Sequence, residues 1–467
     1  MKNHGNPAMR AVACILLAPL CCLSLTGCIG ASGTVGEKRC FTLGYAAEAL
    51  PVETDRIGDY YVAGYRNDHH AVGVLDDQMV KAVVLDDNSG SGCIALVSVD
   101  CVGLSSGDVQ DIRDDLRTFV RKTGCRAIHI TATHDHAGAD TLGLWGPIGQ
   151  NGKDAAFMKQ LREKAALAVE RAYEARTDGT LYFGSTDTRA DGIQEDTRLP
   201  AVYDPHLYSF RFVPFDTTKQ TVRLLNYASH AESLDGDNAM ISADFPAVVA
   251  AELAEREGSA SVWFPGAIGG LLRTRFLEGD RQKNCTVTGQ KIADAVLRIE
   301  NERALEPTLD ITTRSFSVPC ENPMFLGMKF LGILGQKVHK ENGQVCLDTE
   351  MSLLDVGGVQ ILLLPGEIFP ELVYGDDTGF EPNLPDRTLP TLCSVFGDDL
   401  LVFGLTDDEI GYIVPPSDFL LSAKKPYLDT VMDKYWENHY EETNSAGPQT
   451  ARCLYEAALR LKEQLDR

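Results

Sequence analysis

The sequence predicts an α/β protein in which layered mixed β-sheets are flanked by helices. Strand-like and helix-like segments alternate along most of the chain, and no internal repeat, heptad array or low-complexity linker interrupts them after about residue 40. Alternation of this kind favours a layered α/β architecture over a helical bundle or an all-β sandwich. A length of 467 residues alone would suggest about three domains. Because no linker is evident, we expect one large domain over residues 41–467.

Each element has its own signature in the sequence. Two apolar runs, 81–87 and 92–100, predict strands joined by the turn Asn88-Ser89-Gly90-Ser91. Apolar residues at helical spacing from Val109 to Val120 predict a helix, and residues 126–133 predict the next strand. The remaining expected strands lie near 207–214, 220–228, 259–264, 350–356 and 358–364, and the remaining helices near 154–176, 245–257, 285–304 and 448–466.

The amino terminus has the pattern of an export signal. Lys2 and Arg10 precede an apolar stretch over residues 11–25. That stretch is too short for the roughly 30 Å hydrocarbon core of a bilayer, which takes about 20 helical residues, so it predicts a signal peptide.

The sequence Leu25-Thr26-Gly27-Cys28 then resembles the bacterial lipoprotein box. This resemblance implies removal of residues 1–27, lipidation of Cys28, a tether over 28–40 and a location on the extracytoplasmic side of the cell membrane. Cleavage to a freely secreted protein is the alternative.

The composition restricts the partners. With 67 acidic and 43 basic residues the formal net charge is −24, which argues against nucleic acid as a partner. Nine cysteines follow Cys28, and their number is odd and their spacing irregular, so the sequence predicts neither a disulfide framework nor a CxxC zinc site. Cys93 and Cys101 lie in strand-like runs, where we expect buried thiols.

A His-x-His triplet follows one predicted strand directly. In an extended chain, residues i and i+2 point to the same side, so His134 and His136 can face a common point. Imidazole is a common zinc ligand, and this triplet is therefore a candidate half-site for a metal. The alternative is an ordinary polar strand end. Gly138 and Ala139 stand where the metallo-β-lactamase pattern needs Asp-His, which argues against that fold.

Three further strand ends carry potential ligands. His230, Glu367 and Tyr412 each come shortly after an apolar strand-like run. Binding crevices of open α/β sheets lie at the carboxyl ends of strands, so these groups can gather there. From the residues alone, Glu367 could instead cap a helix, and Tyr412 could be a packing residue.

Taken together, these motifs resemble the neutral/alkaline, non-lysosomal ceramidases, which are zinc amidases that cleave the amide of N-acylsphingosines. The matching segments occur in family order and are Thr133-His134-Asp135-His136-Ala137-Gly138, Thr197-Arg198-Leu199-Pro200, His230 with Ile241-Ser242-Ala243-Asp244, Pro365-Gly366-Glu367, Gly411-Tyr412, and Tyr440-Glu441 with Gly447-Pro448.

The resemblance implies a site and a substrate class. One Zn²⁺ would be held by His134, His230, Glu367 and Tyr412, with a ceramide-like N-acyl lipid as substrate. The catalytic groups would be His136, Arg198 and Tyr440, which would stabilise the oxyanion or protonate the leaving amine.

Two features depart from the family pattern. Gly269-Gly270 stands where family members often carry an acidic loop residue, and the chain ends without the family's carboxyl-terminal β-sandwich. Two alternatives therefore stay open: a zinc hydrolase of the same scaffold acting on a different amide or ester, and a non-catalytic lipid-anchored solute-binding lipoprotein. The apolar segment 324–334 is expected to be a buried hairpin or helix, or else a contact for an acyl chain or the bilayer.

Overall fold

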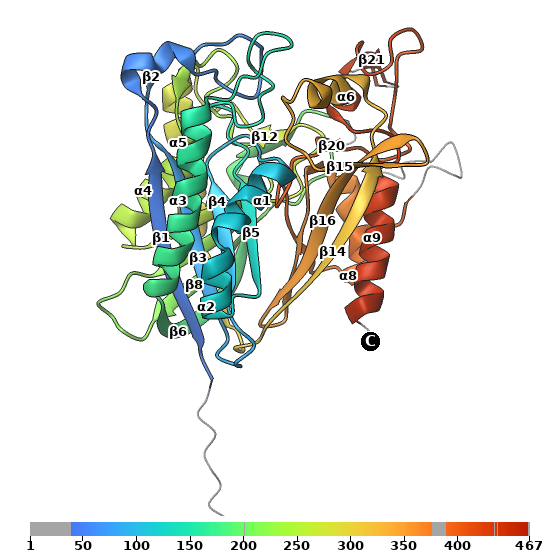
Figure 1. The fold of residues 1–467 in the computed structure, drawn as a ribbon. Helices are drawn as coiled ribbons and strands as arrows, with labels where there is room; N and C mark the ends of the chain where they lie inside the picture. Colours follow the sequence, from blue (N-terminus) through green and yellow to red (C-terminus); the bar gives the residue numbers. More distant parts are fainter. Residues whose placement is uncertain (1–38, 200, 376–388, 434, 437, 466–467) are drawn as a thin grey trace, which may run out of the picture. The chain divides into compact units, whose positions relative to one another are not determined.

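Two β-sheets pack face to face in the computed structural model, and helices cover the outer face of each (Figure 1). The structure describes residues 39–199, 201–375, 389–433, 435–436 and 438–465. Within them the layers run helix, sheet, sheet, helix, which confirms the predicted α/β class with layered mixed sheets. The predicted signal segment 1–27, Cys28 and Pro200 lie outside the described residues.

The first sheet has the strand order β11-β9-β8-β6-β1-β3-β4-β5. Its strands are β1 (Phe41–Leu50), β3 (Gln78–Asp86), β4 (Ile94–Val99), β5 (Ala127–Ala132), β6 (Thr177–Asp187), β8 (His206–Pro214), β9 (Val222–Tyr227) and β11 (Ala260–Pro265), and the short β13 (Arg303–Ala304) pairs with β6. The central strands are antiparallel, whereas β11 with β9 and β4 with β5 are parallel pairs at the two edges.

The second sheet has the order β14-β16-β17-β19. It comprises β14 (Leu309–Pro319), β15 (Val338–Glu341) paired to β16, β16 (Gln344–Val356), β17 (Val359–Leu363) and β19 (Leu401–Phe403). Phe264 of the first sheet stacks on Phe403 of the second, with ring centroids 4.5 Å apart. The side-chain amide of Asn226 donates to the carbonyl of Val402, so a buried hydrogen bond also joins the two sheets.

The continuous apolar runs of the sequence follow from burial on both faces. In β3, Val83 and Leu85 lie in the core between the sheets, whereas Val84 lies in the core beneath the helices. Strands buried on both sides need apolar residues at every position, which explains the unbroken run that the sequence shows there.

Helices close the outer layers. The first sheet is covered by α1 (Ser106–Asp115), α2 (Arg117–Thr123), α3 (Ala155–Glu174), α4 (Asp244–Arg256) and α5 (Arg281–Leu297), and the second by α8 (Leu392–Phe396) and α9 (Thr450–Leu465). The carboxylate of Asp154 accepts a hydrogen bond from the Phe157 amide and caps α3. The predicted helix over 285–304 ends earlier, at Leu297.

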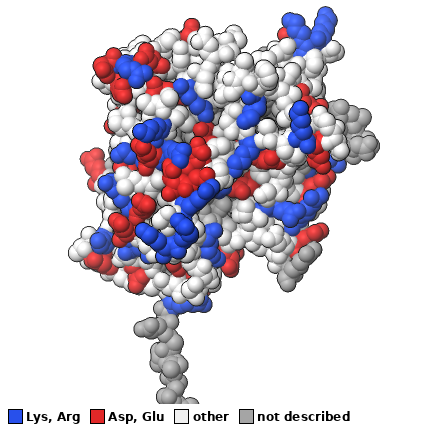
Figure 2. Space-filling view, viewed as in Figure 1, with Lys and Arg blue, Asp and Glu red and all other residues white. Residues whose placement is uncertain are grey.

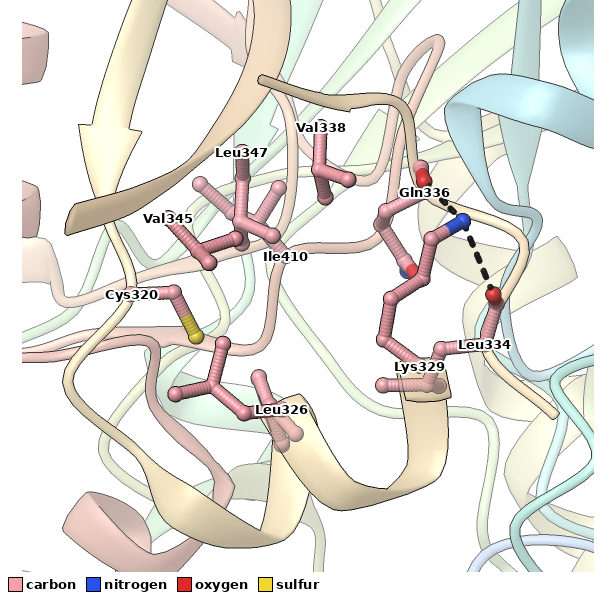
Figure 3. Close-up of a pocket in the computed structure, with 10 residues that line it drawn as sticks. Cys320, Leu326, Lys329, Leu334, Gln336, Val338, Val345, Leu347 and Ile410 are labelled. Atoms are coloured by element: carbon pink, nitrogen blue, oxygen red, sulfur yellow. Dashed lines mark hydrogen bonds between the residues drawn. The ribbon is translucent and has the colours of Figure 1, made fainter. Parts of the chain in front are cut away.

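The segment 324–334 is helical over most of its length, as one alternative predicted, but of its residues only Ile333 and Leu334 are buried. It contains α6 (Pro323–Phe330), in which no residue is buried; Phe330 is 91% exposed and Leu331 60%. A small apolar cavity lies beneath the helix and includes Leu326, Val338 and Ile410 in its lining (Figure 3). The ammonium group of Lys329 donates to the backbone carbonyls of Leu334 and Gln336 and so secures the end of the helix.

Acidic and basic side chains are interspersed on the face shown in Figure 2, despite the net negative charge. Among the described residues, no helix has the length and apolar character that crossing a membrane requires.

Close packing of β1 on α3 gives a testable requirement at Gly44. A Cβ atom at this position would overlap the carbonyl oxygen of Ala172 and lie 2.8 Å from the amide nitrogen of Arg176. We expect Gly44→Ala to lower the free energy of unfolding by about 1–3 kcal/mol, because either strand or helix must shift. Urea unfolding measures this change.

Gly58→Ala is the matched control, because a Cβ at Gly58 meets no atom within 4 Å. Equal stability of the two variants would contradict this packing.

Candidate metal centre

The His-x-His triplet follows β5 and turns back at once. His134 has a φ of 60°, in the left-handed region, so the chain bends sharply after the strand. Gly138 serves close packing: a Cβ there would overlap the side chain of Gln78 and lie 2.6 Å from Asp135 Oδ2.

Three predicted ligands converge on one point. Glu367 Oε2 lies 3.3 Å from His134 Nε2 and 3.1 Å from His230 Nε2, although the three residues come from distant parts of the chain. All three side chains are at least nine-tenths buried. The helix-capping interpretation of Glu367 is wrong, because the residue lies in the short strand β18 (Glu367–Ile368), and α7 (Pro370–Tyr374) begins three residues later.

Backbone carbonyls fix both imidazoles. The Nδ1 atom of His134 is 2.7 Å from the carbonyl oxygen of Val102, and Nδ1 of His230 is 2.6 Å from that of Leu272. With a proton on each Nδ1, both Nε2 atoms present a lone pair to the same point beside Glu367. Hydrogen bonds of this kind from the other ring nitrogen orient histidines that ligate metals.

Tyr412 reaches the same place through strand pairing. It begins β20 (Tyr412–Ile413), which pairs in parallel with β18 and sets Tyr412 opposite Glu367. Left-handed φ angles at Gly366 (78°) and Gly411 (83°) turn the chain into these two strands. The Tyr412 hydroxyl lies 3.3 Å from that of Tyr440, so both predicted phenols are at the site.

His136 lies beside the converging ligands. A ring nitrogen of His136, one of His134 and one of His230 lie within 4.8 Å of one another. Both ring nitrogens of His136 are buried without a hydrogen-bond partner among the described residues, and Nδ1 lies 3.7 Å from Glu232 Oε2.

Arg198 belongs to an adjoining buried cluster. Its Nε lies 3.1 Å from Glu441 Oε1 and its Nη2 3.2 Å from His439 Nε2, and it forms an ion pair with Asp418. The guanidinium also lies over the ring of Phe369, 4.5 Å from the centroid. Its Nη1 has no hydrogen-bond partner among the described residues.

Burial and neighbouring charges shift the pKa values of the groups at this site. Burial by itself would raise the pKa of Glu367, because it disfavours the charged carboxylate. The two imidazoles have a larger, opposite effect and hold this pKa below its usual range. Burial by itself would lower the pKa of His230, because it disfavours the charged imidazole. Contact with Glu367 has a larger effect and raises this pKa. Burial, reinforced by the other two histidines, lowers the pKa of His136 well below its usual value. Burial raises the pKa of both Tyr412 and Tyr440.

Sequence reasoning missed several residues at and beside the site, among them Glu232, His439 and Glu409. Glu232 lies beside His136, His439 lies beside Arg198, and one carboxylate oxygen of Glu409 lies within 4.8 Å of the ligand atoms of His134 and Glu367. The signal for Glu409 was present, because it follows the strand-like run before Tyr412. Its approach to Glu367 depends on the pairing of β18 with β20, which the sequence does not reveal.

Asp244, which belongs to one of the matching segments, binds the loop after His230. Its carboxylate accepts hydrogen bonds from the backbone amides of Ser233, Leu234 and Phe245. It therefore fixes the loop after His230 and the start of α4.

The donor set fits a zinc ion. Two imidazole nitrogens, a carboxylate and a phenol are the ligand types that zinc accepts, and the buried lone pairs of His134, His230 and Glu367 share one point. Zinc ligand distances of about 2.0–2.2 Å place neighbouring ligand atoms roughly 3–3.5 Å apart, which agrees with the separations found here.

Comparisons with known proteins identify the fold. Neither a protein-family model nor a curated protein sequence matches the chain. The crystal structure of neutral ceramidase from Pseudomonas aeruginosa matches with a TM-score of 0.68 and 13% identity, over 91% of this chain and 75% of that one. The chain has the fold of neutral ceramidase. A ceramidase complexed with C2 also matches, with a TM-score of 0.68 and 12% identity, over 92% of this chain and 75% of that one.

The fold comparison supports the resemblance to the neutral ceramidases that the motifs indicate. The ligand set and the catalytic roles stay predictions, although the structure gathers His134, His136, His230, Glu367, Tyr412 and Tyr440 and sets Arg198 in the adjoining cluster.

The loop that positions Arg198 predicts a pH dependence of stability. Asp196 accepts hydrogen bonds from the backbone amides of Arg198 and Val202, and burial raises its pKa to about 7. An unfolded aspartate has a pKa of about 3.9, so the native state binds the proton more tightly and this group costs stability as pH rises from about 4 to 7. Asp196→Asn removes that cost.

Urea unfolding at pH 5 and pH 8 tests this expectation. Relative to the wild type, Asp196→Asn should gain up to about 3 kcal/mol of unfolding free energy between these pH values. Asp216→Asn is the control, because Asp216 is exposed with a lowered pKa and stays ionised throughout. A relative stability of Asp196→Asn that does not change with pH would contradict the assignment.

Proposed function

We propose that the protein is a zinc-dependent amidohydrolase that cleaves the amide bond of ceramide or a related N-acylated amine. The observation that supports this most strongly is the convergence of two imidazoles and a carboxylate within a neutral ceramidase fold. The ceramidase motifs occur in order along the chain, and those that carry His134, His230 and Glu367 meet at this one place.

The proposed ligands are His134, His230, Glu367 and Tyr412. Zinc bound there would supply a water molecule of lowered pKa and polarise the scissile carbonyl. The carbonyls of Val102 and Leu272 hold the two imidazoles in the orientation and tautomer that leave Nε2 free to bind.

The remaining polar groups suit proton transfer and charge stabilisation. His136 is neutral, and neither of its ring nitrogens has a hydrogen-bond partner among the described residues, so it can donate a hydrogen bond to the developing oxyanion. The raised pKa of Tyr440 keeps its phenol protonated, and the phenol can therefore donate a proton to the leaving amine.

We assign Arg198 to substrate binding. Ion pairs with Asp418 and Glu441 and stacking over Phe369 hold its guanidinium in one orientation. The unpartnered Nη1 can then bind a polar group of the substrate, such as a hydroxyl or the carbonyl oxygen.

A different amide or ester is the second candidate, and the glycines at 269 and 270 favour it. A Cβ on Gly269 would lie 2.7 Å from the backbone oxygen of Glu367, so a larger residue does not fit. Gly270 has a φ of 81° and approaches Arg198. Without a carboxylate on this loop, the substrate contacts here differ from those that the family pattern implies.

The proposal also includes a lipid anchor at Cys28, on the extracytoplasmic side of the cell membrane. Anchoring would hold the enzyme close to a poorly soluble N-acyl lipid and raise the rate of encounter without a new contact.

The anchor is tested with Cys28→Ser. The variant should move from the membrane fraction to the soluble fraction while its turnover of a water-soluble short-chain substrate stays unchanged. Fractionation of cells that express each form measures this. Membrane retention of the variant would contradict the anchor.

The function is tested by metal content together with substrate turnover. Purified wild-type protein should hold about one zinc per chain and release fatty acid from N-acylsphingosine faster than from N-acyl amino acids or esters. His230→Ala should lose zinc and activity, because it removes one of the two imidazole ligands.

His206→Ala is the control, because His206 is a partly exposed histidine that contacts Asp204 rather than the centre. Zinc retention by His230→Ala would contradict the ligand set. Zinc binding with turnover of esters alone would favour the second candidate, and zinc binding without turnover would favour a binding protein.

A further inference from the structure

We propose that Glu409 is a second carboxylate ligand of this centre, which gives the metal two imidazoles and two carboxylates. This inference rests on the proposed metal site and adds a ligand that the ceramidase motifs do not supply. The structure supports it through the position of Glu409, through an unpartnered oxygen and through the space reserved for the side chain.

The position allows a bond to the same ion. Ligand atoms of Glu409, Glu367 and His134 lie within 4.8 Å of one another, and all three residues are buried. Ligands on opposite sides of one ion, each about 2.0–2.2 Å from it, are separated by up to about 4.4 Å. Small side-chain rotations therefore bring Glu409 into the coordination sphere.

The two carboxylate oxygens of Glu409 differ in their contacts. Oε1 accepts a hydrogen bond from the Gly411 amide at 2.8 Å, whereas Oε2 is buried without a hydrogen-bond partner among the described residues. Glu409 as a whole is only 7% exposed. A buried carboxylate oxygen without a partner costs free energy, and a cation beside Glu367 would remove that cost.

The surrounding chain holds Glu409 in this place. The side-chain amide of Gln336 donates to the Glu409 carbonyl at 2.8 Å, and the Glu409 amide donates to Asp408 Oδ1 at 3.0 Å. A Cβ at Gly103 would lie 2.8 Å from Glu409 Cγ, so a glycine at 103 leaves room for the side chain. Gly103 follows Val102, whose carbonyl orients His134.

Two carboxylates change the character of the site. Their combined charge balances a divalent cation in a buried place, and with Tyr412 the centre offers five donors rather than four. More oxygen ligands also favour a higher coordination number and broaden the choice of metal toward manganese or iron. In addition, Glu409 brings to the centre a negative charge that the Gly269-Gly270 loop lacks.

The test is a zinc titration of metal-free full-length protein against a chromophoric chelator. Glu409→Gln keeps the size of the side chain and the hydrogen bond to Gly411 but weakens the ligand, so zinc affinity should fall at least about tenfold. Glu48→Gln is the matched control, because Glu48 is a buried glutamate on β1 that pairs with Lys164 and Arg171. A smaller fall for Glu409→Gln would overturn the inference.

Cobalt substitution gives a second readout that does not depend on activity. The visible absorption of the Co²⁺-loaded wild type should be weak, as for five or six ligands, and should strengthen in Glu409→Gln as the coordination number drops. Identical spectra would overturn the inference. If the variant does not fold, a structure of the zinc-loaded wild type decides instead: Glu409 must lie within about 2.5 Å of the ion, and a greater distance overturns it.

These outcomes separate this inference from the proposed function. Wild-type protein that binds zinc and hydrolyses N-acyl lipids, with Glu409→Gln unaltered in affinity, refutes the role of Glu409 alone. Wild-type protein that binds no zinc refutes both proposals.

Discussion

The site depends on one buried carboxylate held between two imidazoles. Glu367 Oε2 lies 3.1 and 3.3 Å from the Nε2 atoms of His230 and His134, and all three side chains are buried. Three lone-pair donors that face one another are unfavourable without a cation or shared protons, because the interior cannot solvate them. The fold must hold the three groups together. Contact with Glu367 favours the protonated form of His230 and relieves part of this cost, and a bound divalent ion would relieve it for all three groups.

The scaffold meets this requirement with strand ends and short backbone contacts. Parallel pairing of β18 with β20 sets Glu367 beside Tyr412, and the loops after β5 and β9 pair with each other through Asp135 and Ala231. The two stacked sheets therefore supply the ligands from both layers. Helices on the outer faces bury the sheets and leave the strand ends to build the site, which agrees with the general rule for layered α/β proteins.

Much of the fold class and of the candidate site was predictable from the sequence, because strand periodicity and polar residues at strand ends are local signals. His134, Glu367 and the layered class all follow from such signals together with the ceramidase motifs. The contacts that depend on pairing between distant strands were not predictable, and Glu409 is the main example. The exposure of α6 was not predicted, because the apolar composition of a segment does not show whether other elements pack over it.

A crystal structure with anomalous scattering recorded at the zinc absorption edge shows whether these groups bind one ion. We expect one peak per chain within about 2.0–2.2 Å of the Nε2 atoms of His134 and His230 and of a carboxylate oxygen of Glu367. A zinc-soaked crystal without a peak there, or with its peak at the cluster around His439, would contradict this expectation.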